Sequence, residues 1–254
     1  MTWALDLDGV LWRGNDPIPG STDAVAALRD RGHQVVFLTN NSHQPVEAYV
    51  AKLRKMGVEV GDDDVITSGQ AAASLLEPGT TGLVCAGPGV EDALRQRGVT
   101  PVRDGEADAV VVGWHSDFDY ERLTAAMAAV LGGARLVGTN DDATYPTETG
   151  LIPGGGSLLA AVAFASSVTP DVAGKPHQAM VALIEERVGD VEVMVGDRPN
   201  TDGLLARNLG ARFALVLSGV THEGDLPVEP EPDMVAPDLA AVVAEWAPAP
   251  DATR

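Results

Sequence analysis

Basic side chains are scarce in this sequence. The chain carries 17 lysines and arginines against 37 aspartates and glutamates, a formal net charge of −20 at pH 7. Such a surface repels nucleic acids and anionic lipids, so we expect neither as a partner. A site for an anionic substrate would need local positive charge, and the chain has only three lysines, Lys52, Lys55 and Lys175.

Cysteine is almost absent. The single Cys85 lies in the apolar run 82–86, so an intramolecular disulfide is excluded. No matching histidine motif accompanies this residue, as a cysteine nucleophile would require. We therefore expect Cys85 to be a buried structural thiol.

Long apolar runs are also lacking. The longest weakly polar run, 156–168, is too short and too rich in serine to cross a bilayer. Asp6 interrupts the only candidate for the apolar core of a signal peptide. We expect no membrane association and a cytoplasmic location.

The 254 residues are enough for one large domain or two modest ones. Apolar runs that predict strands alternate with segments that predict helices, which is typical of parallel sheets covered by helices. Strands are expected at 3–8, 33–38, 83–87, 107–114, 134–138, 191–195, 211–217 and 233–236, and a short strand or turn at 65–69. Helices are expected at 21–31, 45–56, 70–76, 90–97, 120–131, 157–167, 175–188, 198–209 and 238–246. The breaker cluster 78–82 predicts a domain boundary.

Two aspartates end the first expected strand. Asp6 and Asp8 stand at i and i+2, and in a strand such residues point to the same side. Two carboxylates that close repel each other, and a bound cation or a shared proton relieves the repulsion. The alternative for this stretch alone is an ordinary acidic turn, because Asp-Gly is a common turn pair.

Further polar residues stand at the ends of other elements. Thr39 and Asn40 follow the second strand, Asp197 ends a later one, and Lys175 opens an expected helix. In open parallel sheets, ligands bind outside the carboxyl ends of the strands. Each residue alone reads as a cap, a turn or a surface charge, but together they predict one site.

The residue types in this predicted site fit phosphoryl transfer. Asp6, Asp8 and Asp197 can hold a hard cation, and Mg²⁺ fits best because it binds through a few carboxylates, waters and phosphate. A threonine hydroxyl, backbone N–H groups and the amine of Lys175 suit a tetrahedral anion. Attack by one aspartate would give an aspartyl-phosphate, with its neighbour as acid and base.

Four motifs in order resemble those of the haloacid dehalogenase superfamily. They are the segments 6–12, 38–42, 174–176 and 196–202. Their residues are similar to those of the class IIA branch, whose members include p-nitrophenyl-phosphatase-like and phosphoglycolate-phosphatase-like enzymes. The resemblance covers nearly the whole chain, including 145–146 and 150–154. It implies an α/β fold with a Rossmann-like parallel-sheet core, formed by 1–81 and 172–254, and an inserted C2-type cap at 82–171.

The resemblance also assigns roles to the residues of these motifs. It implies that Asp6 is the nucleophile and Asp8 the general acid and base. It also implies that the phosphoryl group is bound by Thr39, Asn40 and Lys175. Mg²⁺ would be held by Asp6, by the backbone carbonyl of Asp8 and by Asp197, with Asp202 near the metal's waters. The implied activity is hydrolysis of small phosphorylated metabolites, and relatives of this class often form homodimers through the cap.

Several residues outside the four motifs have two interpretations. The cap residues His115, Asn140, Asp141 and Asp142 are candidate substrate contacts, with an ordinary surface histidine or a strand end as the alternative. His43 follows the second motif, and its sequence position fits either a substrate contact or an ordinary histidine. Where many branch members carry an acidic residue after the cap strand, this chain has Trp-His-Ser-Asp at 114–117.

The reaction type and the leaving group also have alternatives. A phosphotransferase of the same fold and an inactive phospholigand-binding relative are the rivals to a hydrolase. Asp8 favours hydrolysis, because it supplies a base that activates water. Phosphoglycolate, glycerol phosphate, sugar phosphates, nucleotides and aryl phosphates are all compatible with the sequence.

Overall fold

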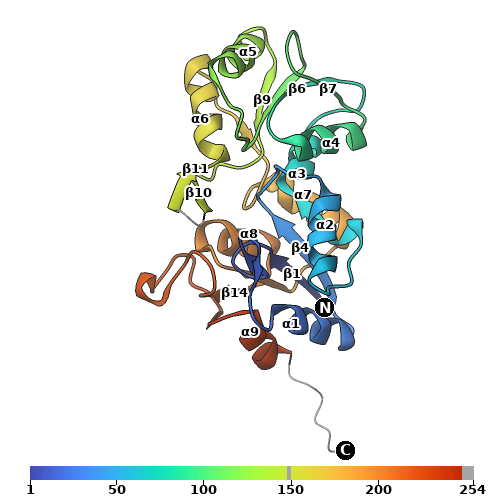
Figure 1. Ribbon diagram of the computed structural model, residues 1–254, viewed down its shortest axis with the longest axis vertical. Coiled ribbons are helices and arrows are strands. Elements are labelled where there is room, and N and C mark those ends of the chain that lie inside the picture. The colour runs from blue at the N-terminus through green and yellow to red at the C-terminus, as the bar shows by residue number, and fades with distance from the viewer. Residues whose placement is uncertain (148–149, 248–254) are drawn as a thin grey trace, which may run out of the picture. The chain divides into compact units, whose positions relative to one another are not determined.

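Two parallel sheets dominate the computed structural model, which describes residues 1–147 and 150–247 (Figure 1). The six-stranded sheet has the order β15-β14-β13-β1-β4-β5 and the five-stranded sheet the order β12-β9-β8-β6-β7. The first contains β1 (Thr2–Asp6), β4 (Gln34–Thr39), β5 (Val65–Thr67), β13 (Val193–Gly196), β14 (Arg212–Val216) and β15 (Met234–Ala236). The second contains β6 (Thr81–Cys85), β7 (Thr100–Val102), β8 (Ala109–Val112), β9 (Arg135–Gly138) and β12 (Asp171–Val172). The predicted α/β class, with a core sheet and a separate second sheet, is confirmed.

Contacts between residues divide the chain into two compact units. The first comprises Met1–Leu38, Val50–Val65 and Ile184–Arg254, and the second Thr39–Tyr49 and Ile66–Leu183. These borders differ from the predicted core and cap borders at 81/82 and 171/172, which stay a prediction.

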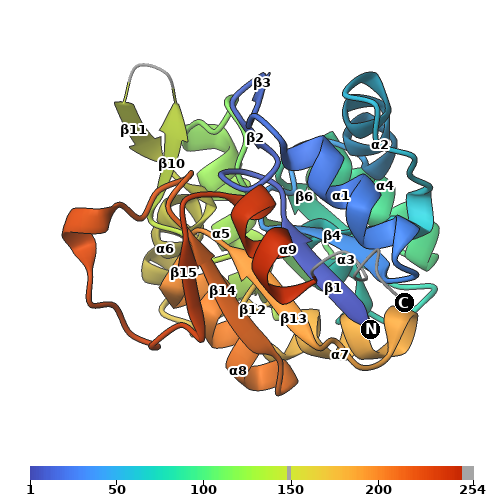
Figure 2. The same cartoon turned by 90° about the horizontal axis from the view of Figure 1, so that it is seen from below.

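The first unit is built around β1, whose five residues are all buried. This strand lies between β13 and β4 in parallel register, with Leu5 opposite Val195 and Asp6 opposite Leu38. Figure 2 shows β1, β13 and β14 side by side. Helix α1 (Ser21–Asp30) packs against α9 (Leu239–Trp246), and α8 (Leu204–Leu209) packs on β14 and β13. The parallel register brings the carboxyl ends of β1 and β13 to one edge of the sheet.

The second unit has its own apolar core. Side chains of β6, β8 and β9 pack there against α5 (Tyr120–Leu131) and α6 (Gly155–Ser166). Helix α3 (Ser68–Ser74) packs against α4 (Pro88–Arg97), and β10 (Thr144–Thr147) pairs with β11 (Gly150–Pro153) as an antiparallel hairpin. Cys85 belongs to this core, and burial raises the pKa of its thiol to about 11. The expectation of a buried thiol is confirmed.

The structure corrects several boundaries. Helix α7 (Gln178–Val188) begins three residues after Lys175, because the chain first makes a turn in which the His177 N–H donates to the Gly174 carbonyl. Short strands occur where loops were expected, at β2 (Trp12–Arg13), β3 (Asp16–Pro17), β10 and β11, and β7 and β12 were also missed. Such short strands contain too few residues for an alternation of apolar and polar side chains to be recognised in the sequence. Helix α2 (Val46–Lys55) begins and ends close to its expected positions.

Among the described residues, no helix combines the length and the apolar character needed to cross a membrane.

Candidate active site

Three aspartates of the first unit come together at the carboxyl edge of the six-stranded sheet. Asp6 ends β1, Asp197 directly follows β13, and Asp202 lies in the short π-helical segment Pro199–Gly203 that leads into α8. One carboxylate oxygen from each lies within 4.8 Å of the other two, and all three residues are buried. Buried carboxylates this close are costly unless a cation or protons compensate them. An all-oxygen donor set is what a hard divalent cation such as Mg²⁺ prefers, so the residues present fit that ion.

The segment 220–221 holds both the carboxylate and the backbone carbonyl of Asp197. The N–H of Val220 donates to its Oδ2 at 2.6 Å, and the Thr221 hydroxyl donates to its carbonyl oxygen at 2.6 Å. Gly219 must be a glycine here, because an added Cβ would lie 2.5 Å from the Cβ of Asp197. This loop was not among the predicted site residues, although the Ser-Gly pair after the expected strand at 211–217 marks its position in the sequence.

Gly9 and Gly196 make the same close approach to the acidic group. A Cβ on Gly9 would lie 2.6 Å from Cγ of Asp197, and Gly9 also has a positive φ of 86°, which other residues rarely adopt. Gly196 lies directly against the side chain of Asp202, whose Oδ2 accepts from the Arg198 N–H at 3.1 Å. Only small residues leave room for carboxylates to be packed so closely.

Asp8 is placed differently from Asp6. Strand β1 ends at Asp6, so the strand argument that aimed both side chains to one side does not extend to Asp8. The half-buried Asp8 lies in the following turn, where its Oδ1 accepts from the indole N–H of Trp12 at 2.9 Å. Its carboxylate is not part of the group formed by Asp6, Asp197 and Asp202.

The residues predicted to bind the phosphoryl group lie in the second unit, where Asn40 is central. Its Oδ1 accepts from the backbone N–H of Lys175 at 2.7 Å, and its Nδ2 donates to the Lys175 carbonyl at 3.1 Å. The Asn40 carbonyl accepts from the Ser68 hydroxyl at 2.7 Å and from Asn140 Nδ2 at 2.8 Å. Thus Asn40 fixes the backbone of Lys175 through both ends of its side-chain amide.

Thr39 and Lys175 are both almost fully buried, at 1% and 2% exposed. The Oγ1 of Thr39 accepts from the Asn41 N–H at 3.0 Å, which folds the loop after β4 back on itself. A buried ammonium group is rare and requires compensation by negative charge or hydrogen bonds. Its burial in a chain this acidic makes Lys175 a strong candidate for contact with an anion.

Three predicted cap residues surround this loop. Asp142 Oδ2 accepts from Asn40 Nδ2 at 3.1 Å, and Asn140 Oδ1 accepts from the Asp142 N–H at 3.2 Å. Asp141 Oδ2 lies 3.1 Å from Nε2 of His177, and this hydrogen bond lowers the pKa of Asp141. These contacts connect the loop after β9 to the segment that carries Lys175.

The two histidines with alternative interpretations, His43 and His115, have different surroundings. His115 is only 4% exposed, its Nδ1 lies 2.9 Å from the Gly113 carbonyl oxygen, and burial lowers its pKa. The alternative of an ordinary surface histidine is therefore wrong. The ring of His43 meets Trp114 edge-on at 4.9 Å, and Trp114 stacks on Tyr145 at 5.7 Å.

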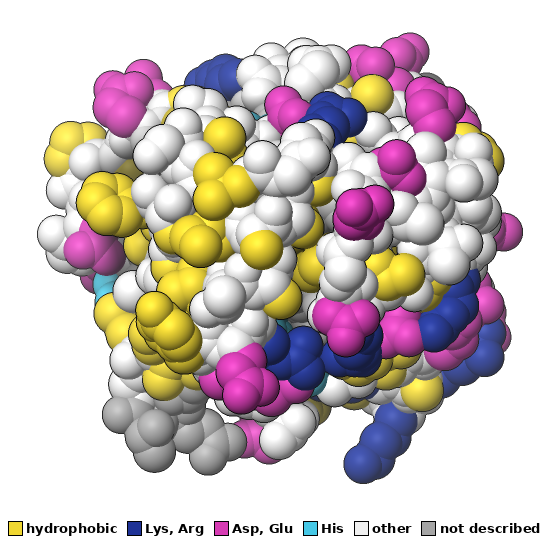
Figure 3. Space-filling view, turned by 90° about the horizontal axis from the view of Figure 1, so that it is seen from above, with side chains coloured by type: hydrophobic (Ala, Val, Ile, Leu, Met, Phe, Trp, Pro, Cys, Tyr) yellow, Lys and Arg dark blue, Asp and Glu magenta, His cyan; other side chains and the backbone are white. Residues whose placement is uncertain are grey.

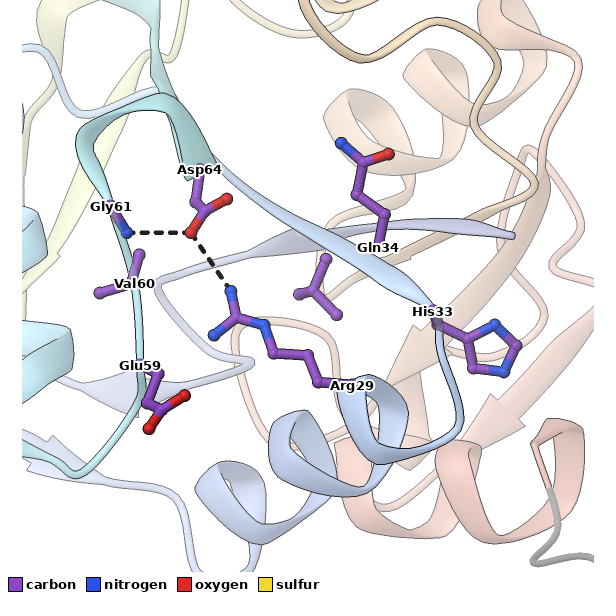
Figure 4. Close-up of a pocket in the computed structure, with 8 residues that line it drawn as sticks. Arg29, His33, Gln34, Glu59, Val60, Gly61 and Asp64 are labelled. Carbon is purple, nitrogen blue, oxygen red and sulfur yellow. Dashed lines mark hydrogen bonds and ion pairs between the residues drawn. The ribbon is translucent and has the colours of Figure 1, made fainter.

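A pocket of about 390 Å³ lies elsewhere in the first unit (Figure 4). It is lined by residues of α1, of the start of β4 and of the segment 59–64, so it lies at the amino ends of the strands. The guanidinium of Arg29 pairs there with Asp64 at 3.4 Å. The pocket thus contains a basic side chain paired with an acidic one, in contrast to the all-acidic group at the opposite end of the strands.

Family models identify the class of protein to which this fold and site correspond. One described as haloacid dehalogenase-like hydrolase matches residues 3–100, and one described as HAD-hydrolase-like matches residues 172–242. The chain belongs to this family of hydrolases, as the four motifs predicted.

Individual relatives are similar over nearly the whole chain. An acid sugar phosphatase of Staphylococcus aureus (strain USA300) is 31% identical over 250 residues, which cover 96% of both chains. A p-nitrophenyl phosphatase from Archaeoglobus fulgidus superposes with a TM-score of 0.89 at 30% identity, covering 95% of this chain and 97% of that one. A glycerol phosphate phosphatase from Mycobacterium tuberculosis in complex with magnesium has a TM-score of 0.87 at 33% identity, covering 95% of this chain and 75% of the other.

Proposed function

We propose that this protein is a Mg²⁺-dependent phosphatase that hydrolyses phosphomonoesters of small soluble metabolites. The observation that carries the proposal is the buried group of Asp6, Asp197 and Asp202 at the carboxyl edge of a parallel sheet. Relatives that match this chain from end to end are named acid sugar phosphatase, p-nitrophenyl phosphatase and glycerol phosphate phosphatase. Glycerol, sugar and aryl phosphates are therefore the substrates to test first, and phosphoglycolate and nucleotides come next.

In the proposed reaction Asp6 is the nucleophile. One of its carboxylate oxygens forms a bond to phosphorus as the bond between phosphorus and the ester oxygen breaks, and Asp8 gives its proton to the departing oxygen. Asp8, now a carboxylate, takes a proton from water, and the water oxygen bonds to phosphorus. The bond from phosphorus to Asp6 then breaks, which releases inorganic phosphate and restores both aspartates.

The other residues bind and orient the reacting group. Asp6, the backbone carbonyl of Asp8 and Asp197, with Asp202 close by, would hold Mg²⁺, which when bound would neutralise charge on the phosphoryl oxygens. We assign the phosphoryl oxygens to the hydroxyl of Thr39, the amine of Lys175 and the backbone around Asn40. The buried ammonium of Lys175 offsets, at the site, the repulsion between an acidic chain and an anionic substrate.

The proposal is tested by phosphate release from p-nitrophenyl phosphate with Mg²⁺ and with a chelator in its place. We expect turnover only with the metal, and a loss of about 10³-fold or more in Asp6→Asn, since removing a nucleophile removes the covalent route. Asp63→Asn, at an exposed position of the same unit, is the matched control and should keep full activity. Metal-independent turnover, or turnover that survives Asp6→Asn, would reject this mechanism.

The rival activities have distinct outcomes in the same assay. A phosphotransferase would yield a new phosphate ester when an alcohol acceptor is added, at the expense of inorganic phosphate. A binding relative without chemistry would bind phosphate esters and release none. The presence of Asp8 as a base for water favours hydrolysis over both.

We further propose a homodimer formed through α5 and α6. These helices pack against each other and carry exposed apolar side chains, with Tyr120 83%, Leu131 64% and Phe164 89% exposed. Figure 3 views one face of the molecule on which hydrophobic side chains gather. Sedimentation of the wild type should give a dimer and Phe164→Glu a monomer, while Val235→Glu, at an exposed position of β15, should leave the mass unchanged.

A further inference from the structure

The indole of Trp12 contacts the side chain of Asp8. Its Nε1–H donates to Oδ1 of Asp8 at 2.9 Å, and Trp12 is 1% exposed. Water therefore has little access to the indole side of this hydrogen bond, which makes the bond stronger than it would be in solution. No role described above requires a tryptophan at this position.

The backbone around the pair keeps the two side chains in register. The N–H groups of Leu11 and Trp12 both point to the Leu7 carbonyl, at 2.9 and 3.3 Å, and the Gly9 N–H donates to the Trp12 carbonyl at 2.7 Å. These bonds close a tight loop over 7–12 that begins directly after Asp6. Asp8 and Trp12 are thus four residues apart in a loop with little freedom.

Lys52 lies over the face of the same indole. Its Nζ lies 3.8 Å from the ring centroid, well within the range of a cation–π contact, and donates to the Gly14 carbonyl at 2.7 Å. Gly14 lies between β2 and β3, so Lys52 connects α2 to the hairpin that carries Trp12. A cation over the face of an indole draws electron density from the ring, which strengthens its N–H as a donor.

We propose that Trp12 and Lys52 are positioning residues that hold the carboxyl group of Asp8 for proton transfer to the leaving group. An indole nitrogen donates and never accepts, so it cannot take the proton of Asp8. Oδ1 accepts from Trp12 whether or not Asp8 is protonated, and the transferred proton therefore resides on Oδ2. Trp12 and Lys52 thus keep Oδ2 of Asp8 as the oxygen that gives and takes the proton in both halves of the reaction.

This arrangement has a consequence for the substrates. Proton transfer matters most when the leaving group is a poor one, such as an alkoxide of glycerol or a sugar, and least when it is an electron-poor phenolate. An enzyme with a fixed acid is suited to esters of ordinary alcohols. The inference rests on the proposed function, because it assumes that Asp8 is the general acid.

A series of aryl phosphates with leaving groups of graded basicity tests the inference. Phenyl, p-nitrophenyl and 2,4-dinitrophenyl phosphate are compared by kcat/KM in wild type, Trp12→Phe and Asp8→Asn. We expect Trp12→Phe to lose about tenfold or more with phenyl phosphate and less than about threefold with the dinitrophenyl ester, a part of what general acid catalysis contributes. Asp8→Asn should lose more, with the same trend. An equal loss with all three esters, or no loss, would overturn the inference.

Variants of Lys52 keep the test valid if Trp12→Phe does not fold. Lys52→Met should also lower kcat/KM more for phenyl phosphate than for the dinitrophenyl ester, but by less than Trp12→Phe does. Lys52→Arg should keep the wild-type values of kcat/KM, since a guanidinium also lies well over an indole. Lys55→Met, exposed on the same helix, is the matched control. A Lys52→Met enzyme identical to wild type would overturn the role of Lys52. A wild type that cleaves none of the esters would instead reject the proposed function itself.

Discussion

Asn40 holds the backbone of Lys175 from both sides, since its Oδ1 accepts from the Lys175 N–H at 2.7 Å and its Nδ2 donates to the Lys175 carbonyl at 3.1 Å. The two residues are 135 positions apart in the chain. The side chain of Asn40 thus acts on the segment that presents the buried lysine. This relationship explains why an amide, with one acceptor and two donors, is useful at position 40.

The first prediction follows from this contact. Asn40→Ala removes the acceptor and the donor that fix the backbone of Lys175, and each such hydrogen bond contributes about 1 kcal/mol to stability. We expect a lower melting temperature and weaker competitive inhibition by inorganic phosphate. Calorimetry and inhibition kinetics measure the two effects. Gln96→Ala, exposed on α4, should change neither, and unchanged phosphate inhibition in Asn40→Ala would contradict the assignment.

A second prediction concerns the loop that holds Asp197. In Gly219→Ala the new Cβ would lie 2.5 Å from the Cβ of Asp197, so the carboxylate or the loop must shift. We expect a destabilisation of about 1–3 kcal/mol, as for other overpacked sites. The Mg²⁺ concentration that gives half-maximal activity should also rise. Gly224→Ala meets nothing within 4 Å and is the matched control, so equal effects of both substitutions would refute the argument.

The third prediction is a pH dependence of stability that comes from His115. Burial lowers its pKa from 6.5, so below pH 6.5 the unfolded chain binds a proton that the folded one refuses. Unfolding then takes up a proton, and the free energy of unfolding falls as the pH drops, by up to about 1.4 kcal/mol per pH unit. The contribution is fully present above pH 6.5 and is lost on acidification toward the folded-state pKa.

Urea unfolding at a series of pH values from 7.5 to 5.5 measures this effect. His115→Gln should flatten the slope below pH 6.5, whereas His222→Gln, at an exposed position, should retain it. A His115→Gln protein with the wild-type slope would show that other groups carry the pH dependence.

The fourth prediction concerns the thiol of Cys85. Because burial raises its pKa to about 11, almost no thiolate is present near pH 8, and the sulfur is also shielded from solvent. We expect no labelling of the native protein by a thiol reagent at that pH and one equivalent of label per chain in urea. Rapid labelling of the native protein would mean that the second unit opens readily around β6.

Much of the fold could be predicted because its signals are local. A polar residue stands at or directly after the end of each of the apolar runs that became β1, β4 and β13, and the parallel arrangement of such strands brings their carboxyl ends to one edge. The grouping of Asp6 with Asp197 follows from that arrangement, whereas Asp202, which lies before α8, was expected there only from the resemblance of the segment 196–202 to the family motif.

Other features depend on contacts between distant segments and leave little trace in sequence. A tryptophan four residues after Asp8 reads as an apolar position, and nothing in the pattern points to its indole N–H or to Lys52 above the ring. The start of α7 was placed at Lys175 because proline is favoured at the first position of a helix, but the turn closed by His177 comes first. The burial of His115 depends on packing against Phe118, which hydropathy does not reveal.

The polypeptide passes from one compact unit to the other four times, at 38/39, 49/50, 65/66 and 183/184. Neither unit is therefore a continuous piece of polypeptide, and a chimaera that transplants 82–171 from a relative would leave α3 behind in the host. The buried face of α4, with Val90 and Leu94 at 0% exposed, would then meet foreign side chains. A chimaera that keeps the packing of the second unit intact therefore requires 39–49 and 66–183 to be exchanged together.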